Sequence, residues 1–318
     1  MSDFSRVLVT GGAGFIGSHL VNKLIIRGYS VVVLDNFCSG KIENLREVLG
    51  RDGFEIFKGD VRDGKAVREA MDDVDAVVHL AALINVEESV NNPVETHDVN
   101  VVGTINVLEK AVRNGVKRFV YASSTAVYGE GNSLPLREDH SPKPISPYAA
   151  SKISAECYCR AFNNCYGLRT VMLRYFNVYG SGQEHSSYGG VITRFLQSAF
   201  NDEPLIVYGD GKQIRDFIYV DDVVEATVLA LENNYSKCEA INICTGRPTA
   251  INELVQILKD VTGRNLKVVY DKPRKGDART NYGDPAKAED ILRFKAKISL
   301  RKGLELLVNN YSDFCSSA

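Results

Sequence analysis

Tyr148 and Lys152 form the pair of side chains in this sequence that best fits acid–base chemistry. They stand four residues apart in a segment, 147–166, with a helical pattern, so they share one face of the predicted helix. A tyrosine has an ordinary pKa near 10, about three units too high for a base at neutral pH. A neighbouring ammonium group favours the phenolate. The pair is therefore a candidate general base with its activator.

A glycine-rich turn near the start of the chain predicts a dinucleotide site. The segment TGGAGFIG, 10–17, directly follows a predicted strand and opens a predicted helix. Gly11, Gly14 and Gly17 permit the tight turn, because glycine reaches backbone angles that other residues avoid. A backbone without Cβ atoms can also approach a pyrophosphate, which lies at the helix N-terminus.

Two carboxylates follow at the ends of the next predicted strands. Asp35 lies where a carboxylate accepts hydrogen bonds from the adenosine ribose and repels a 2′-phosphate, which favours NAD over NADP. Asp60 either faces the adenine amino group or is a solvated carboxylate. A cationic nicotinamide ring would add to the ammonium group of Lys152 in favouring the phenolate of Tyr148.

Ser124 ends the fifth predicted strand. Ligands bind at the carboxyl edge of parallel sheets. The hydroxyl of Ser124 can therefore share a hydrogen bond with Tyr148 and with the substrate oxygen that exchanges a proton.

A parallel sheet must position these residues, because apolar runs of strand length alternate with amphipathic helices. We predict a doubly wound α/β fold of the Rossmann type with a smaller, interleaved C-terminal lobe. The expected NAD domain is 1–176 plus about 214–246, and the expected substrate lobe is about 177–213 plus 247–318. The expected strands are 6–11, 31–35, 54–60, 75–82, 118–124, 170–180 and 241–246, and the expected helices are 18–28, 64–71, 94–114, 147–166 and 251–261.

Composition limits the classes of partner. The 318 residues have a net charge of -2, and the sequence has no apolar run of membrane-spanning length and no leader-like start. We therefore expect a cytoplasmic protein without nucleic-acid or membrane partners. Cys157, Cys159 and Cys165 lack the paired spacing of a zinc site, so we expect no metal.

Seven motifs give the chain a resemblance to a known family over nearly its whole length. TGGAGFIGSHL, HLAA (79–82), ASSTAVYG, SPYAASK (146–152), LRYFNVYG (173–180), RDFIYVDD (215–222) and PRKGDAR (273–279) occur in this order. The chain resembles the extended short-chain dehydrogenases/reductases, and within them most resembles the UDP-glucose (UDP-galactose) 4-epimerases.

The resemblance implies oxidation of a UDP-sugar at its 4-hydroxyl by tightly bound NAD, rotation of the 4-keto sugar, and return of the hydride to the other face. Tyr148, Lys152 and Ser124 would be catalytic, with the division of the proton role between Ser124 and Tyr148 left open. The expected NAD contacts are Gly11, Gly14, Phe15, Ile16, Gly17, Asp35, Asn36, Asp60, Val61, Leu80, Ala81, Ala82, Asn100, Ser123, Tyr148, Lys152 and Tyr175.

The same resemblance implies a set of substrate contacts. Arginine forks suit a diphosphate, an aspartate can bind a ribose hydroxyl, and the position of Asn281 would gate the 2-substituent of the sugar. The expected residues are Ser124, Tyr148, Asn177, Val191, Arg215, Arg274, Asp277 and Asn281. Asn281 leaves both UDP-hexoses and UDP-N-acetylhexosamines open as substrates.

Several alternatives compete with a UDP-glucose 4-epimerase. Dehydratases of the superfamily carry Asp-Glu where this chain has Thr125 and Ala126, which cannot move a proton for elimination, and related decarboxylases typically place a Glu in this stretch. A UDP-glucuronate 4-epimerase and another NAD-dependent nucleotide-sugar oxidoreductase stay open as alternatives, although Glu87 and Glu88 would disfavour a uronic acid if either faces the site. A non-catalytic NAD sensor would usually have lost Tyr148 or Lys152. The helices 94–114 and 147–166 are the usual dimer helices of the superfamily, so a homodimer is expected.

Overall fold

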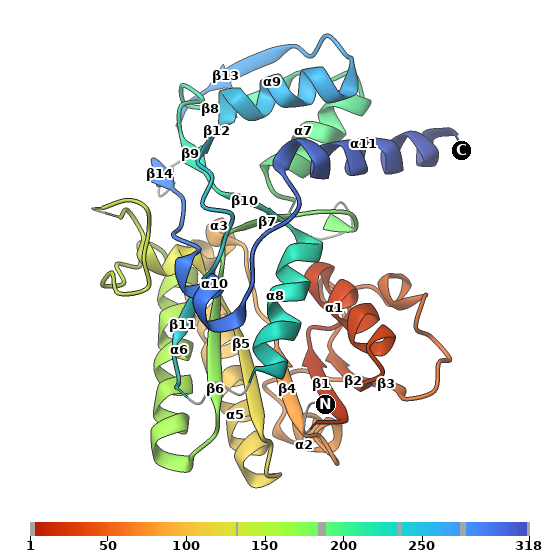
Figure 1. The fold of residues 1–318 in the computed structure, drawn as a ribbon, viewed down its shortest axis with the longest axis vertical. Coiled ribbons are helices and arrows are strands. Elements are labelled where there is room, and N and C mark those ends of the chain that lie inside the picture. Colours follow the sequence, from red (N-terminus) through yellow and green to blue (C-terminus); the bar gives the residue numbers. More distant parts are fainter. Residues whose placement is uncertain (1–3, 132, 184–188, 234–236, 274–277, 317–318) are drawn as a thin grey trace.

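A seven-stranded parallel sheet forms the centre of the computed structural model, which describes residues 4–131, 133–183, 189–233, 237–273 and 278–316 (Figure 1). Its strand order is β11-β6-β5-β4-β1-β2-β3. The strands are β1 (Arg6–Thr10), β2 (Ser30–Asp35), β3 (Phe54–Lys58), β4 (Ala76–His79), β5 (Arg118–Ser124), β6 (Thr170–Tyr175) and β11 (Ala240–Ile243). This arrangement confirms the predicted doubly wound Rossmann fold.

The strands are apolar throughout because both faces of the sheet are covered. In β1, Val7 and Val9 pack into one core and Leu8 packs into the other. Helices α1 (Phe15–Ile26) and α8 (Val220–Glu232) contact each other on the first face, and α2 (Gly64–Ala70), α5 (Gly103–Arg113) and α6 (Pro147–Tyr166) cover the second.

The predicted helix 94–114 is interrupted. It consists of α4 (Pro93–His97), a π-helical turn at Asp98–Val102, and α5, and a short helix α3 (Val86–Asn91) precedes it. A π-turn inserts one residue into the helical ladder, and its sequence has no signature that periodicity detects.

The predicted strand 170–180 is also divided, because β6 ends at Tyr175. The next strand, β7 (Asn177–Tyr179), pairs instead with β10 (Phe217–Tyr219) in a separate parallel sheet. The strand expected at 241–246 is shorter in the structure, because β11 covers only Ala240–Ile243. The apolar run at 170–180 hides the change of sheet.

The remaining elements form a lobe that Figure 1 shows above the carboxyl ends of the central strands. Two small sheets and several helices build it: β8 (Leu205–Tyr208) pairs with β13 (Val268–Asp271), and β9 (Ile214–Arg215) lies between β12 (Thr249–Ala250) and β14 (Thr280–Asn281). The helices are α7 (Val191–Phe200), α9 (Ile251–Thr262), α10 (Ala286–Leu292) and α11 (Leu300–Ser316).

Asp216 joins the interleaved segments. It is fully buried, and its carboxylate accepts hydrogen bonds from the backbone N–H groups of Thr245 (2.9 Å) and Gly246 (2.9 Å), and from that of Gly283 (3.4 Å). Three segments far apart in the sequence therefore meet at one buried carboxylate.

Among the residues that the structure describes, no helix combines the length and apolar character that crossing a bilayer requires. The His, Cys, Asp and Glu side chains of the same residues form no group of three or more that could hold a metal ion.

Candidate active site

Helix α6 begins and ends with strong local signals. The Ser146 hydroxyl accepts a hydrogen bond from the Ala149 N–H (3.2 Å), Pro147 occupies the first turn, and Gly167 ends the helix with a φ of 72°. These are the capping residues that helix ends favour. They place Tyr148 in the first turn and Lys152 one turn later.

Lys152 and Tyr148 lie close together, and Lys152 contacts β5 near its carboxyl end. Both are buried, with 4% and 8% of their surfaces exposed. The Lys152 Nζ donates to the Ala122 carbonyl (2.8 Å) and lies 6.0 Å from the centre of the Tyr148 ring and 5.0 Å from that of Tyr121. Burial lowers the pKa of Lys152 to about 8. A cation so close to the Tyr148 ring favours the phenolate.

Ser124 lies at the end of β5 and caps the short 3₁₀ helix Thr125–Tyr128. Its Oγ accepts a hydrogen bond from the Ala126 N–H (3.1 Å). Ser123 points to the opposite face of the strand, where its hydroxyl donates to Glu156 Oε1 (2.6 Å). The two neighbouring hydroxyls therefore have different surroundings.

The glycine turn is as tight as its sequence predicts. Gly11 has a φ of 70°, and a Cβ there would lie 2.8 Å from the Ala81 nitrogen. A Cβ on Gly17 would lie 2.2 Å from the Gly11 carbonyl oxygen. Such contacts leave no room for any side chain, so the backbone between β1 and α1 is bare at the helix N-terminus, and the segment after β4 lies beside it.

Asp35 is held beside this turn. Its carboxylate is buried and accepts hydrogen bonds from the backbone N–H groups of Ala13 (2.9 Å) and Phe37 (2.8 Å). Burial raises the pKa of Asp35 and the two hydrogen bonds oppose this rise. Each carboxylate oxygen has a second lone pair for a ribose hydroxyl. A glycine turn without side chains, followed by the fixed carboxylate of Asp35, fits a dinucleotide without a 2′-phosphate.

Asp60 was expected either to face the adenine or to be solvated, and neither interpretation included its partner, Arg62. Arg62 binds its carboxylate with two hydrogen bonds, Nε to Oδ1 (2.9 Å) and Nη2 to Oδ2 (2.8 Å), and Asn36 Nδ2 donates to Oδ2 (3.0 Å). The hydrogen bonds from Arg62 contribute most to lowering the pKa of Asp60 to about 2. Asp60 is therefore an ion-paired carboxylate.

Asn100 lies in the π-helical turn and clamps the loop after β4. Its side chain accepts from the Leu83 N–H (2.8 Å) and donates to the Leu83 carbonyl (2.9 Å) and the Ser151 hydroxyl (2.9 Å). The loop segment Leu80–Ala82 is thus fixed between the glycine turn and α6. Of the other predicted cofactor residues, Phe15 and Ile16 begin α1, Val61 is buried, and the buried Tyr175 hydroxyl lies 2.7 Å from Thr227 Oγ1.

His79, which the sequence marked only as part of HLAA, lies at the centre of a buried hydrogen-bond chain. The Thr104 hydroxyl donates to the Asn100 carbonyl (2.6 Å), so it must accept from His79 Nε2 (2.9 Å). His79 Nδ1 then accepts from the Thr10 hydroxyl (2.7 Å). Burial lowers the pKa of His79 to about 3, so the ring is neutral. This chain connects the glycine turn with the helix that carries Asn100.

The predicted substrate residues come from both lobes. Asn177 donates from its backbone (3.1 Å) and its side chain (2.9 Å) to the Asp216 carbonyl. Arg215 and Asn281 are register partners in β9 and β14, and Asn281 Oδ1 accepts from the Thr125 hydroxyl (3.0 Å). This last bond joins the lobe to the segment that Ser124 caps.

Of the three remaining predicted substrate residues, the structure describes one. Val191 is the first residue of α7. Arg274 and Asp277 lie outside the described residues.

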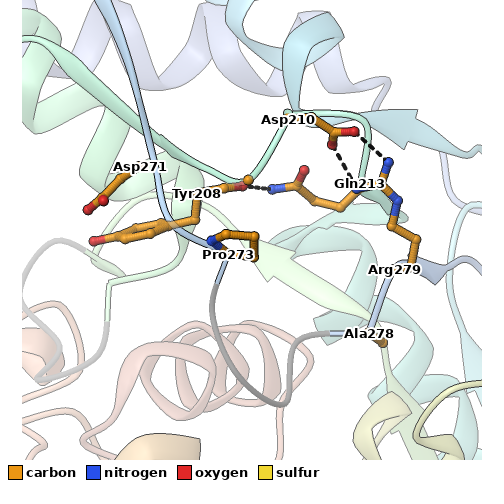
Figure 2. A pocket seen from close by; sticks show the side chains of 8 residues that line it. Tyr208, Asp210, Gln213, Asp271, Pro273, Ala278 and Arg279 are labelled. Atoms are coloured by element: carbon orange, nitrogen blue, oxygen red, sulfur yellow. Dashed lines mark hydrogen bonds and ion pairs between the residues drawn. The ribbon is translucent and has the colours of Figure 1, made fainter.

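A pocket of about 450 Å³ opens in the lobe, next to the ends of β8 and β13 (Figure 2). Gln213 Nε2 donates to the Tyr208 carbonyl (2.8 Å), and Arg279 binds Asp210 through two hydrogen bonds (2.7 and 2.8 Å). The lining residues are Tyr208, Gly209, Asp210, Gln213, Asp271, Pro273, Ala278 and Arg279. The sequence prediction missed this pocket, although an aromatic residue before Gly-Asp-Gly, just ahead of Arg215, was a usable signal.

A Rossmann sheet with a bare glycine turn and a buried Tyr–Lys pair at its carboxyl edge defines the short-chain dehydrogenase/reductase class. Residues 7–244 match the NAD dependent epimerase/dehydratase family. The chain belongs to this family, is an enzyme of it, and uses NAD as its cofactor.

Solved structures similar to this chain support the same assignment. The UDP-glucose 4-epimerase of Thermotoga maritima with UDP-glucose is 40% identical (TM-score 0.92, 98% of this chain and 99% of that one). A UDP-N-acetylglucosamine 4-epimerase from Methanobrevibacter ruminantium with UDP-N-acetylmuramic acid is 38% identical (TM-score 0.92, 99% and 100%). The Thermus thermophilus UDP-glucose 4-epimerase complex with NAD is 37% identical (TM-score 0.88, 96% and 99%).

Proposed function

We propose that the protein is a nucleotide-sugar 4-epimerase that interconverts UDP-glucose and UDP-galactose with tightly bound NAD. The observation that carries the proposal is the convergence of Tyr148, Lys152 and Ser124 at one edge of the sheet, next to a segment without an acidic side chain. Thr125 and Ala126 offer no acid or base for elimination, which favours epimerisation over dehydration. The similarity to solved 4-epimerases supports the same reaction.

The residues of the site divide the work as follows. NAD, when bound, supplies the hydride acceptor and donor. Tyr148 accepts the proton of the sugar 4-hydroxyl, Lys152 stabilises the phenolate through its positive charge, and Ser124 hydrogen-bonds to the same sugar oxygen. After the 4-keto sugar has rotated, Tyr148 returns the proton, so the side chains end in their starting state.

The proposed cofactor site follows the carboxyl edge of the sheet. The glycine turn holds the pyrophosphate at the N-terminus of α1, where the helix dipole favours negative charge. Asp35 accepts from the adenosine ribose. We assign NAD to 1–176 with about 214–246 and the nucleotide sugar to about 177–213 with 247–318, with β9 at the border between them.

The proposed substrate site spans both lobes. Arg215 and Arg274 bind the diphosphate, and Asp277 binds a ribose hydroxyl. The pocket lined by Tyr208 receives the nucleotide base against the ring of that residue. A flat aromatic face and nearby amide groups suit a heterocyclic base.

The cofactor cycle gives the main test. Because NAD returns to its starting state, purified protein should release NAD on denaturation and should convert UDP-galactose to UDP-glucose without added NAD. Protein that lacks bound dinucleotide and consumes NAD stoichiometrically would contradict the epimerase proposal and indicate a dehydrogenase.

A UDP-N-acetylhexosamine is the second candidate substrate. Asn281 is smaller than a tyrosine, and its amide oxygen accepts a hydrogen bond from the Thr125 hydroxyl (3.0 Å). The similar UDP-N-acetylglucosamine 4-epimerase supports this alternative. Turnover of UDP-galactose, UDP-N-acetylgalactosamine and UDP-galacturonate should be compared side by side.

We also propose a homodimer formed through α4, α5 and α6. Apolar side chains are exposed along α4, the π-helical turn that follows it, and α6: Val94 is 72% exposed, Val102 is 39% exposed and Tyr158 is 40% exposed. Burial of such side chains stabilises association. The thiols of six cysteines are free, which is consistent with the cytoplasmic location that we propose; they are Cys38, Cys157, Cys159, Cys165, Cys238 and Cys244.

A further inference from the structure

A buried ion pair lies directly behind the proposed catalytic serine. Glu156 follows Lys152 by one more helical turn on α6 and is fully buried. Arg174 on β6, 1% exposed, binds its carboxylate with two hydrogen bonds, Nε to Oε1 (2.9 Å) and Nη2 to Oε2 (2.8 Å). Arg160, one turn further along α6, also donates to Oε2 (3.2 Å). Burying two charges is costly, and replacement of such pairs by apolar residues is often neutral or stabilising. Stability alone therefore does not explain a buried ion pair next to the Ser124 segment.

The ion pair contacts the chain before and after Ser124. On the preceding side, the Ser123 hydroxyl donates to Glu156 Oε1 (2.6 Å). On the following side, the Arg174 guanidinium lies 4.7 Å from the centre of the Tyr128 ring, and Tyr128 is the last residue of the 3₁₀ helix that Ser124 caps. Ser124 therefore belongs to a segment, 123–128, that the ion pair contacts at both ends.

Glu156 also lies one helical turn from Lys152 and is the acidic residue of α6. Burial raises the pKa of Glu156, but the hydrogen bonds and charge of Arg174, together with the Ser123 hydrogen bond and the charge of Arg160, outweigh this effect and hold that pKa below its ordinary value. Glu156 is therefore ionised at neutral pH. Its charge opposes the effect of burial on Lys152.

The other titratable groups that act on Lys152 within the described chain carry no charge at neutral pH. Burial raises the pKa of Cys159, on the same helix, and that of Tyr121, on β5, well above their ordinary values. On β4, burial keeps His79 neutral. The Tyr148 ring completes the surroundings. Glu156 is thus the anionic member of this group.

We propose that Glu156 is a positioning residue for the reaction: paired with Arg174, it fixes the hydroxyl of Ser124 and holds a negative charge beside Lys152. This inference rests on the proposed function, because it assigns Ser124 and Lys152 their roles in epimerisation. Glu156 itself contacts neither substrate nor cofactor. It acts through Ser123, through the segment that Tyr128 ends, and through its charge.

Two variants separate the two actions. Glu156→Gln keeps the size of the side chain and removes the charge, while its amide N–H₂ faces the donor groups of Arg174. Ser123→Ala removes only the hydrogen bond and keeps the ion pair. Glu69→Gln, on the exposed surface of α2, is the matched control. All are tested as NAD-loaded protein.

The first measurement is amide hydrogen exchange at residues 124–128, which requires no substrate. Glu156→Gln and Ser123→Ala should both exchange faster there, and Glu69→Gln should match the wild type. Wild-type exchange in both variants would overturn the positioning role. If Glu156→Gln does not fold, Ser123→Ala alone decides this point.

The second measurement is the pH profile of kcat and KM for UDP-galactose across pH 6 to 10. Both variants should lower kcat roughly 10- to 100-fold with little change in KM, because misplacing a reacting group by about 1 Å costs about 100-fold. Only Glu156→Gln should move the alkaline limb to lower pH, because Lys152 loses the anion that keeps it protonated.

The outcomes of the second measurement are distinct. An unchanged kcat in both variants, or an alkaline limb that stays in place in Glu156→Gln, would overturn the proposal. A wild type that converts no UDP-hexose would contradict the proposed function instead, and the exchange measurement would still decide whether Glu156 fixes the Ser124 segment.

Discussion

Replacing Lys152 by methionine should stabilise the fold while it abolishes activity. Burial lowers the pKa of Lys152 from 10.5 to about 8, and a shift of this size corresponds to about 3 kcal/mol of penalty for the charged form at neutral pH. Methionine keeps the length of the stem and removes this penalty. It also loses the hydrogen bond from the charged ammonium to the Ala122 carbonyl, worth about 1.5–3 kcal/mol. The expected net gain is therefore about 1 kcal/mol at pH 7.

The pH dependence gives the prediction its sign. The pKa of Lys152 is lower in the folded than in the unfolded chain, so the unfolded chain binds more protons between pH 8 and 10.5. The stability of the wild type therefore rises with pH in this window. Lys152→Met has no such group, so its advantage should shrink as the pH rises from 8 towards 10.5.

The assay is urea unfolding of NAD-free wild type and Lys152→Met at pH 7, 8, 9 and 10, with the free energy of unfolding taken by linear extrapolation. NAD is removed because Lys152 is proposed to contact it. A variant that is less stable than the wild type at pH 7, or an advantage that does not change with pH, would refute the reasoning.

Three other substitutions test the site. Tyr148→Phe should slow single-turnover reduction of bound NAD by UDP-galactose roughly 100- to 10,000-fold, the contribution of a positioned general base, with an unchanged melting temperature; a wild-type rate would show that Tyr148 is not the base. Asp35→Ala should weaken NAD binding, measured by calorimetric titration, by about 1.5–3 kcal/mol, and should reduce the difference in affinity between NAD and NADP. A wild type that binds NADP more tightly than NAD would rule out the ribose assignment. Gly17→Ala should abolish NAD retention because its Cβ would lie 2.2 Å from a backbone oxygen, whereas Gly64→Ala, with no neighbour closer than 3.8 Å, should retain NAD.

Local spacing was enough to predict the parts of the site that lie within one turn or one helix. The glycine turn and the pair Tyr148 and Lys152 each depend on intervals of a few residues, and their capping residues are adjacent in the sequence. The strands were predictable because a sheet covered on both faces requires continuous apolar runs. These features are encoded next to the residues that they position.

Contacts between distant segments were not predictable in this way. Two partners of Glu156, Ser123 and Arg174, come from β5 and β6, and Asn281 meets Thr125 across more than a hundred residues. The division of the run 170–180 at Phe176 leaves the apolar pattern unbroken, since β7 is also apolar. The π-turn at Asp98–Val102 and the ion pair between Asp60 and Arg62 likewise have no periodic signature.

The meeting of three segments at Asp216 has a consequence for how the protein unfolds. The last strand of the central sheet, β11, follows much of the lobe in the sequence, so neither part is one continuous stretch of chain. Loss of the buried carboxylate would release both parts at once. The sheet and the lobe should therefore melt in a single cooperative transition, and a ligand that binds only the lobe should protect the amides of the sheet from exchange as well.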